Sequence, residues 1–350
     1  MKKINAAVVG VTGYTGMELV RILIAHPGFD LVAVTSRSQA GKSLTELFPF
    51  LAGTDAEVLP VTFPDPELVA RDCHVVFLAV PHGTAMNMAA GFVNQKVKVV
   101  DLSADFRLRD VKTYTEWYGV EHTRTGLVQE AVYGLPEIYG SEIARARLVA
   151  NPGCYPSSVI LALYPGLKQG LLNPEGIIVD SKSGVSGAGR AAKTGTLFSE
   201  AADSFRAYSL GRHRHTPEME QELCAAAGQE LRISFSPHLV PMNRGILSTC
   251  YVYPAGDIKT ERLRMVYKEF YRDSPWVRIL PEGVLPETRW VRGTMYCDLG
   301  FVLDERTGRL IIVSCIDNLC RGASGQAVAN ANLMAGFDLE LGLKDLPLMP

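Results

Sequence analysis

The first 150 residues alternate short apolar runs with helical patterns, and this alternation limits the possible folds more than any other feature. The apolar runs include INAAVVG, LVAVTS, HVVFLAV and VKVVDLS. Between the first two, MELVRILIAH repeats apolar residues at helical spacing and ends at a Pro-Gly pair. Repeated strand–helix–strand units predict an α/β fold with a doubly wound parallel sheet that is covered by helices on both faces.

A glycine turn joins the first predicted strand to the first predicted helix. The sequence GVTGYTG places Gly10, Gly13 and Gly16 at G-x-x-G-x-x-G spacing, which differs from the common G-x-G-x-x-G pattern. Glycines in this context let the backbone approach a pyrophosphate that lies at the helix N-terminus. We interpret the turn as the dinucleotide-binding loop of a Rossmann-type domain. The alternative is an ordinary tight strand-to-helix loop.

The end of the second predicted strand indicates which dinucleotide binds. An NAD site carries an acidic residue about 20 positions after the glycines, where it accepts hydrogen bonds from the ribose. Asp30 has this spacing but precedes the strand. The residues that follow the strand are Ser36, Arg37 and Ser38. Because hydroxyls and a guanidinium suit a 2′-phosphate, we predict NADP(H), with a solvated loop arginine as the alternative.

The chain is long enough for two domains, since it has 350 residues. After about residue 176 the pattern becomes β-rich, with helical stretches near 217–227 and 260–272. We predict a dinucleotide-binding domain over 1–155, completed by a C-terminal helix within 318–350. Residues 156–317 are predicted to form a second α+β domain for catalysis and oligomerisation.

Composition excludes several classes of partner. The net charge is −2, with charges of both signs interspersed, so neither nucleic acid nor an anionic membrane is indicated. No apolar run approaches the roughly 18 residues of a membrane span. The seven cysteines contain no C-x-x-C pair, so we predict no disulfide framework and no metal site, and a reducing cytoplasm as the location.

The segment NPGCYPSS places a cysteine between a Pro-Gly turn and the predicted start of an apolar helix. Pro156 fits the first helical position and Pro165 fits the end. Cys154 then lies at the positive end of the helix, where the dipole and the N–H groups favour a thiolate. We interpret Cys154 as a nucleophile, and the other six cysteines as core residues. A purely structural cysteine is the alternative.

A nucleophile needs a proton acceptor, and the segment GRHRHTPEME offers two imidazoles. His213 and His215 precede a predicted helix that has Thr216 as its N-cap and Pro217 at its first position. A His-x-His pair also occurs in metal sites, but no further ligand is spaced with this pair. We predict that one histidine is the acid/base and the other contacts the substrate or the fold, and the sequence leaves open which is which.

Small residues dominate the segment SKSGVSGAGR, which ends in an arginine. Consecutive backbone N–H groups in such a loop bind anions well. A flexible loop is the alternative. The predicted phosphate-binding residues are Ser183, Gly184, Ser186, Gly187 and Arg190.

Taken together, the motifs resemble one family over essentially the whole chain. They are GVTGYTG, AVPHG, DLSADFR, NPGCYP, SGVSGAGR, HRH and DNLCRGASGQA, in this order. The chain resembles the N-acetyl-gamma-glutamyl-phosphate reductases, in the group that contains aspartate-semialdehyde dehydrogenase. Cys320 stands where an aliphatic residue is expected.

The resemblance implies roles for individual residues. It makes Cys154 the nucleophile, places the acid/base in HRH, and brings Asn318 to the nicotinamide. Ser36, Arg37 and Ser38 meet the 2′-phosphate. The residues that line the pyrophosphate are Gly10, Thr12, Gly13, Tyr14, Thr15 and Gly16.

The resemblance also implies the reaction, in which NADPH reduces N-acetyl-gamma-glutamyl phosphate through a cysteine thioester in arginine biosynthesis. The expected partners are the acyl phosphate, inorganic phosphate and further copies of the chain, as a dimer or tetramer. Two alternatives stay open. One is a sister reductase that acts on aspartyl or carrier-linked aminoadipyl phosphate, and the other is a non-catalytic NADP-binding sensor.

Overall fold

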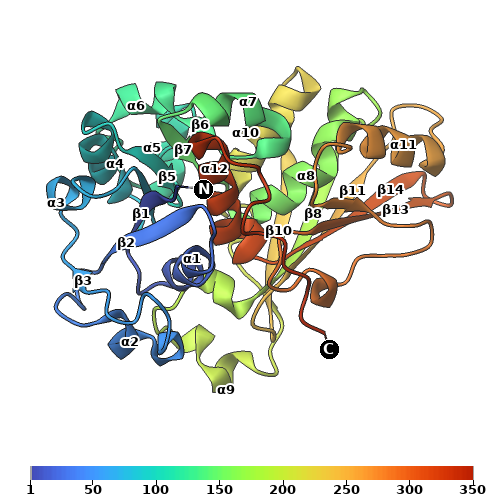
Figure 1. The fold of residues 1–350 in the computed structure, drawn as a ribbon. Helices are drawn as coiled ribbons and strands as arrows, with labels where there is room; N and C mark the ends of the chain where they lie inside the picture. The colour runs from blue at the N-terminus through green and yellow to red at the C-terminus, as the bar shows by residue number, and fades with distance from the viewer. Residues whose placement is uncertain (1, 350) are drawn as a thin grey trace. The chain divides into compact units, whose positions relative to one another are not determined.

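The structure, a computed structural model, describes residues 2–349. The chain divides into two units, and each has its own sheet (Figure 1). The first unit comprises Met1–Pro152 and Ala323–Lys344, and the second comprises Gly153–Gly322 and Asp345–Pro350. The chain therefore enters the second unit just before Cys154 and leaves it just after Gly322.

The first unit contains a seven-stranded sheet in the order β3-β2-β1-β4-β5-β7-β6. All its strand pairs are parallel, so the predicted doubly wound parallel sheet is confirmed. The order reverses between β1 and β4, and such sheets bind ligands beyond the carboxyl ends of the strands at this point. The strands are β1 (Ile4–Val9), β2 (Phe29–Thr35), β3 (Val61–Thr62), β4 (Val75–Leu78), β5 (Lys98–Asp101), β6 (Val132–Tyr133) and β7 (Leu148–Ala150).

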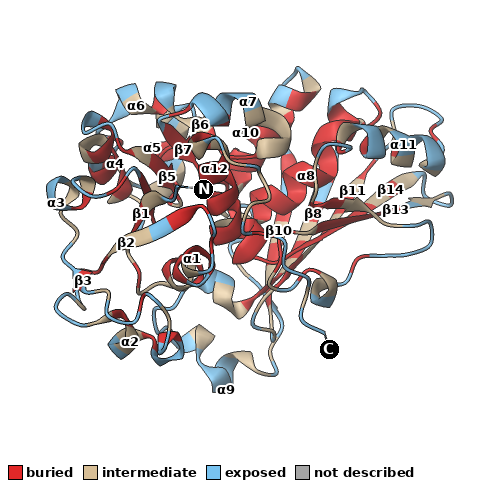
Figure 2. Ribbon diagram, in the orientation of Figure 1, coloured by how far each residue is buried: buried red, intermediate tan, exposed pale blue. Residues whose placement is uncertain are grey.

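Helices connect these strands and cover the sheet. In β4 and β7 every residue is buried, as expected for parallel strands that are covered on both faces, and Figure 2 shows this buried interior. The helices are α1 (Tyr14–Ile24), α2 (Leu44–Leu47), α3 (Pro66–Ala70), α4 (Ala85–Asn94), α5 (Val111–Tyr118), α6 (Thr125–Glu130), α7 (Pro136–Arg145) and α12 (Gly325–Ala335).

The C-terminal part of the chain returns to the first unit through α12. Just before this helix, the Ser324 hydroxyl donates a hydrogen bond to the Thr15 carbonyl in the first turn of α1, at 2.8 Å. The prediction of one continuous helix within 318–350 is wrong in extent. The chain first makes a π-helical turn over Cys320–Ser324, and α12 covers 11 residues.

The second unit contains a seven-stranded mixed sheet in the order β12-β13-β14-β11-β8-β10-β9. The pairs β8–β10 and β12–β13 are parallel and the others are antiparallel. This arrangement confirms the predicted α+β unit. The strands are β8 (Ile177–Gly184), β9 (Arg206–Ala207), β10 (Ile233–Val240), β11 (Ile246–Val252), β12 (Val277–Ile279), β13 (Cys297–Asp304) and β14 (Arg309–Ile316).

One face of the second sheet is covered by helices. Alternate residues of β8, β10 and β11 are buried, which is typical of a sheet with one covered face. Helices α8, α10 and α11 pack against the sheet, and α8 also packs against both α10 and α11. The helices of this unit are α8 (Cys154–Lys168), α9 (Phe198–Ala201), α10 (Thr216–Ala227) and α11 (Thr260–Phe270).

Helix α8 is held on the sheet by four buried serines. Ser181, Ser248 and Ser314 lie side by side on β8, β11 and β14. The Ser158 hydroxyl of α8 lies 3.0 Å from that of Ser248 and 3.1 Å from that of Ser314. Because buried hydroxyls need hydrogen-bond partners, this cluster favours one position of α8 along the sheet.

Candidate active site

The three glycines of the GVTGYTG turn have different surroundings. A Cβ atom on Gly10 would lie 2.4 Å from the Ala79 carbonyl oxygen, and one on Gly16 would lie 2.4 Å from the Gly10 carbonyl oxygen. At Gly13, the nearest atom to such a Cβ is Thr15 Oγ1, at 3.9 Å. Gly10 and Gly16 therefore permit close packing of the turn, whereas Gly13 leaves space in which a pyrophosphate can approach the start of α1.

The end of β2 lies beside this turn. The N–H groups of Gly10 and Val11 both donate to the Thr35 carbonyl, at 3.1 and 3.0 Å. Thr35 Oγ1 is buried and has no hydrogen-bond partner among residues 2–349. The exposed Arg37 follows directly. An unpartnered hydroxyl and an exposed guanidinium at this edge fit a phosphorylated ribose.

Asp30 does not lie at this edge. It is the second residue of β2, not a residue before the strand as predicted, and it pairs with Asn5 at the start of β1. Its position at the amino end of the sheet still separates it from the glycine turn. Ser36 is 4% exposed, so Arg37 and Ser38 are the accessible members of the predicted trio.

The DLSADFR segment holds two loops at the carboxyl end of the first sheet. The Asp105 carboxylate accepts hydrogen bonds from the N–H groups of Gly83, at 2.7 Å, and Met86, at 2.9 Å. The Arg107 guanidinium donates to the Asn151 carbonyl at 2.8 Å. The segment thus supports both the loop after β4 and the chain that leads into Cys154.

Cys154 is the first residue of α8 and is partly exposed. The predicted start at Pro156 and end near Pro165 are wrong, because the helix runs from Cys154 to Lys168. Its N-cap, Gly153, donates its N–H to the buried Glu218 carboxylate at 2.8 Å. The thiol therefore lies at the positive end of a helix whose entry is fixed by a hydrogen bond to α10.

Both predicted histidines lie against the ring of Tyr155, the residue that follows Cys154. The ring centroids of His213 and His215 lie 5.4 and 6.0 Å from that of Tyr155, and 4.9 Å from each other. His215, not Thr216, is the N-cap of α10. The structure therefore brings together the start of α8 and the start of α10, and with them the three predicted catalytic residues.

The two imidazoles differ in hydrogen bonding. The backbone N–H of His215 donates to His213 Nδ1 at 3.1 Å. Burial and, to a lesser extent, the nearby Arg214 charge together lower the pKa of His213 to about 4. His213 is therefore neutral at pH 7. Because its Nδ1 accepts a hydrogen bond, its proton lies on Nε2, which can act as a hydrogen-bond donor.

Two tyrosine hydroxyls lie beside these groups. Those of Tyr155 and Tyr208 are 2.9 Å apart. Burial raises the pKa of both phenols, that of Tyr208 to about 12, and negative charge on Cys154 contributes to each shift. Both phenols therefore keep their protons at neutral pH and present hydroxyl dipoles near the thiol.

The loop after β8 does not offer the predicted run of N–H groups. Those of Gly184, Val185 and Ser186 donate to carbonyls of the 242–245 segment, and the Ser186 hydroxyl donates to Asn243 O at 2.5 Å. The Ser183 hydroxyl donates to the Gly184 carbonyl at 3.1 Å. Sequence alone could not reveal these partners, which lie about 60 residues away. The exposed part of the loop is 187–190, so Gly187 and Arg190 are the exposed members of the predicted phosphate-binding set.

Asn318 is engaged within the second unit. Its Oδ1 accepts the Gly245 N–H at 2.7 Å, and its Nδ2 donates to the Ser186 hydroxyl at 2.9 Å. Its predicted approach to a nicotinamide therefore stays a prediction. Its observed role is to support the loop after β8.

Sequence reasoning did not single out Glu218, Tyr208 or Gly322. A Cβ atom on Gly322 would lie 2.7 Å from that of Cys154, although 168 residues separate the two. Glu218 and Gly322 stand within or beside the HRH and DNLCRG motifs, which is the signal that could have drawn attention to them. Tyr208 carries no comparable signal.

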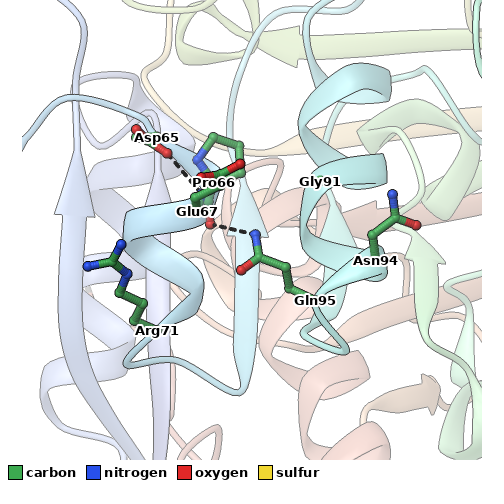
Figure 3. Close-up of a pocket in the computed structure, with 7 residues that line it drawn as sticks. All are labelled: Asp65, Pro66, Glu67, Arg71, Gly91, Asn94 and Gln95. Atoms are coloured by element: carbon green, nitrogen blue, oxygen red, sulfur yellow. Dashed lines mark hydrogen bonds between the residues drawn. The ribbon is translucent and has the colours of Figure 1, made fainter.

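A cavity of about 790 Å³ lies on the first unit. Figure 3 shows it between α3 and α4, with Asp65, Arg71 and Gln95 among its lining residues. None of the predicted site residues lines it. Among residues 2–349, no three His, Cys, Asp or Glu side chains gather as metal ligands, and no helix has the length and apolarity to cross a bilayer.

Comparison with known proteins identifies the family. The family models "Semialdehyde dehydrogenase, NAD binding domain" and "Semialdehyde dehydrogenase, dimerisation domain" match residues 5–146 and 154–318. The chain is 49% identical to the N-acetyl-gamma-glutamyl-phosphate reductase of Desulfotalea psychrophila, over 99% of this chain and 100% of the relative. The chain belongs to the N-acetyl-gamma-glutamyl-phosphate reductase family. The relative of the same name in Pelotomaculum thermopropionicum is 50% identical, over 99% of each chain.

Solved structures show the same fold. Aspartate semialdehyde dehydrogenase II from Vibrio cholerae superimposes with a TM-score of 0.73 at 17% identity, covering 96% of this chain and 99% of that chain. The enzyme from Candida albicans, solved with NADP, gives a TM-score of 0.69 at 16% identity, covering 95% and 99%. At these identities the likeness concerns the fold, which this reductase shares with the dehydrogenases.

Substitutions in the glycine turn should separate cofactor binding from folding. Gly13→Ala places a methyl group in open space, so we expect a normal melting temperature and NADPH binding weakened about tenfold. Gly16→Ala forces a methyl group against backbone, so we expect a stability loss of about 1–3 kcal/mol. Fluorescence titration with NADPH and thermal unfolding measure the two effects. Equal NADPH affinity in Gly13→Ala and wild type would contradict the assignment.

Proposed function

We propose that the chain reduces N-acetyl-gamma-glutamyl phosphate to N-acetylglutamate semialdehyde and phosphate with NADPH, in arginine biosynthesis. The observation that carries the chemistry is the position of His213 and His215 against the ring of Tyr155, the residue that follows Cys154 at the start of α8. The substrate is supported by full-length relatives of that name, about half identical to this chain. The cytoplasm is the proposed location, in keeping with seven cysteines that form no disulfide among residues 2–349.

The proposed cofactor site is built from the glycine turn and the end of β2. Gly13 and the first turn of α1 receive the pyrophosphate, with Thr12, Tyr14 and Thr15 beside it. Arg37 and Ser38 receive the 2′-phosphate. NADPH, when bound, supplies the hydride that reduces the acyl group.

Cys154 is the proposed nucleophile. Its sulfur bonds to the acyl carbon, the carbon–oxygen bond to phosphate breaks, and phosphate leaves with the bonding electrons. The result is a thioester on Cys154. After reduction, the carbon–sulfur bond breaks, the aldehyde leaves and the sulfur takes up a proton, which restores the thiol. The covalent intermediate divides one difficult displacement into two easier steps.

His215 is the proposed acid/base. His213 is a poor candidate, because its Nδ1 already accepts a hydrogen bond and its low pKa opposes protonation. His215 takes the thiol proton as sulfur attacks, and passes it to the departing phosphate oxygen. His213, as a neutral donor at Nε2, orients the acyl oxygen.

The departing phosphate is assigned to the exposed part of the loop after β8. Gly187 and the Arg190 guanidinium supply the proposed contacts, and Arg190 offers a bidentate donor pair to phosphate oxygens. Asn318 and Ser186 position this loop, since their side chains are hydrogen-bonded to each other.

The decisive assay measures phosphate-dependent NADP⁺ reduction with three semialdehydes. We expect kcat/KM for N-acetylglutamate semialdehyde to exceed that for aspartate semialdehyde and for carrier-linked aminoadipate semialdehyde. Cys154→Ser should bind NADPH normally and lose at least about 10³-fold in kcat, because an alcohol replaces the thiolate.

Cys224→Ser, at another cysteine that is not fully buried, is the matched control and should keep its activity. Preference for a different semialdehyde would show that the substrate is that of a sister reductase. NADPH binding without turnover of any of the three would favour the sensor.

The roles of the two histidines can be separated by isosteric changes. His215→Gln should lower kcat by about 10²–10⁴-fold, because the acid/base is lost. His213→Asn keeps an acceptor for the His215 N–H, and should cost about tenfold by loss of one donor. Steady-state kinetics on both variants test the assignment, and a larger loss in His213→Asn would reverse it.

We also propose a homodimer that forms through the outer face of the second sheet. The matched dimerisation model covers this unit, and the face carries half-buried Leu247, Tyr251 and Ile311. Tyr251→Glu should yield monomers in sedimentation velocity experiments at micromolar concentration, because it buries a charge in the interface. Met265→Glu, at an exposed position of α11, should not. A monomeric wild-type protein would rule out this dimer.

A further inference from the structure

The six-residue segment 317–322 touches the nucleophile through a glycine. A Cβ atom on Gly322 would lie 2.7 Å from Cys154 Cβ and 3.1 Å from Cys154 Cα. Gly322 is not among the glycines with positive φ, so its backbone conformation is open to other residues. Lack of space beside Cys154, and not conformational freedom, therefore requires glycine here.

A buried carboxylate shapes this segment. Asp317 Oδ1 accepts the N–H groups of Leu319 and Cys320, at 2.8 and 2.7 Å, and Oδ2 accepts that of Gly293 at 2.7 Å. The Asp317 carbonyl accepts the Gly322 N–H at 2.9 Å. Asp317 is fully buried. These bonds close the turn and fix where Gly322 lies against the thiol-bearing residue.

The same segment also supports the loop after β8. Asn318, next to Asp317, is hydrogen-bonded to Gly245 and to the Ser186 hydroxyl. A Cβ atom on Gly187 would lie 3.7 Å from Asn318 Nδ2. One short stretch of chain is thus in contact with both the nucleophile and the loop assigned to phosphate.

We propose that segment 317–322 positions the two halves of the reaction site relative to each other. Asp317 and Gly322 position Cys154, and Asn318 positions the loop after β8. A displacement of about 1 Å in a reacting group can cost about 10²-fold in rate. Segment 317–322 therefore influences kcat by positioning Cys154 and the loop after β8. The inference rests on the proposed function only for the roles of Cys154 and the loop.

Gly322→Ala tests the contact with the nucleophile. The added methyl group should displace Cys154, lower kcat by about 10²-fold and slow alkylation of Cys154 by iodoacetamide about tenfold, with NADPH affinity unchanged. Mass spectrometry of the Cys154 peptide measures alkylation independently of any substrate. Gly126→Ala, where a Cβ meets no atom within 4 Å, is the matched control and should behave as wild type.

Asn318→Asp tests the contact with the loop. The aspartate keeps an oxygen for the Gly245 N–H but loses the donor to Ser186. We expect KM for phosphate to rise about tenfold, while alkylation of Cys154 stays at the wild-type rate. If segment 317–322 only stabilised the fold, the variants would change the melting temperature. They would not differ in the expected way, with slower alkylation in Gly322→Ala and a higher KM for phosphate in Asn318→Asp.

Unchanged kcat and alkylation in a folded Gly322→Ala protein would overturn the proposal, as would an unchanged KM for phosphate in Asn318→Asp. If Gly322→Ala does not fold, Asp317→Asn takes its place. It puts an amide where the Gly293 N–H needs an acceptor, and should slow Cys154 alkylation. Wild-type alkylation in that variant would equally contradict the proposal. If the enzyme did not use the proposed substrate, the alkylation results would be unaffected, because they are measured without substrate. Failure of the proposed function can therefore be distinguished from failure of this proposal.

Discussion

Burial of α8 against the second sheet is the constraint on which the site depends. Every residue from Tyr155 to Leu167 is buried, and Ser158 joins the hydroxyl cluster of three strands. A helix enclosed in this way cannot slide or rotate without breaking buried hydrogen bonds. Cys154, its first residue, is partly exposed. The fold therefore places a partly exposed thiol at the start of a helix that is otherwise buried.

Buried polar groups around that thiol are arranged so that few of them ionise. Low pKa keeps His213 neutral, and high pKa keeps Tyr155 and Tyr208 protonated. His213, Tyr155 and Tyr208 are thus uncharged at neutral pH. Environments that push neighbouring pKa values apart are typical of sites that perform acid–base chemistry.

Local patterns in the sequence predicted much of the fold and the motifs of the candidate site. They could not predict contacts between residues that lie far apart in the chain. Strand and helix alternation predicted the doubly wound sheet, and the NPGCYP and HRH motifs contain Tyr155 and the two histidines whose rings the structure places together. The loop after β8 was misjudged because its N–H groups bond to carbonyls of the 242–245 segment. The contact of Gly322 with Cys154 joins residues far apart in the chain, and no periodicity or spacing reveals such a contact.

One hydrogen bond, from the Gly153 N–H to Glu218, ties the first turn of α8 to the first turn of α10. Cys154 at the start of α8 is thereby linked to His213 and His215 at the start of α10. A displacement of one helix start would therefore carry the other with it, so that the thiol and the two imidazoles proposed for proton transfer would keep their spacing.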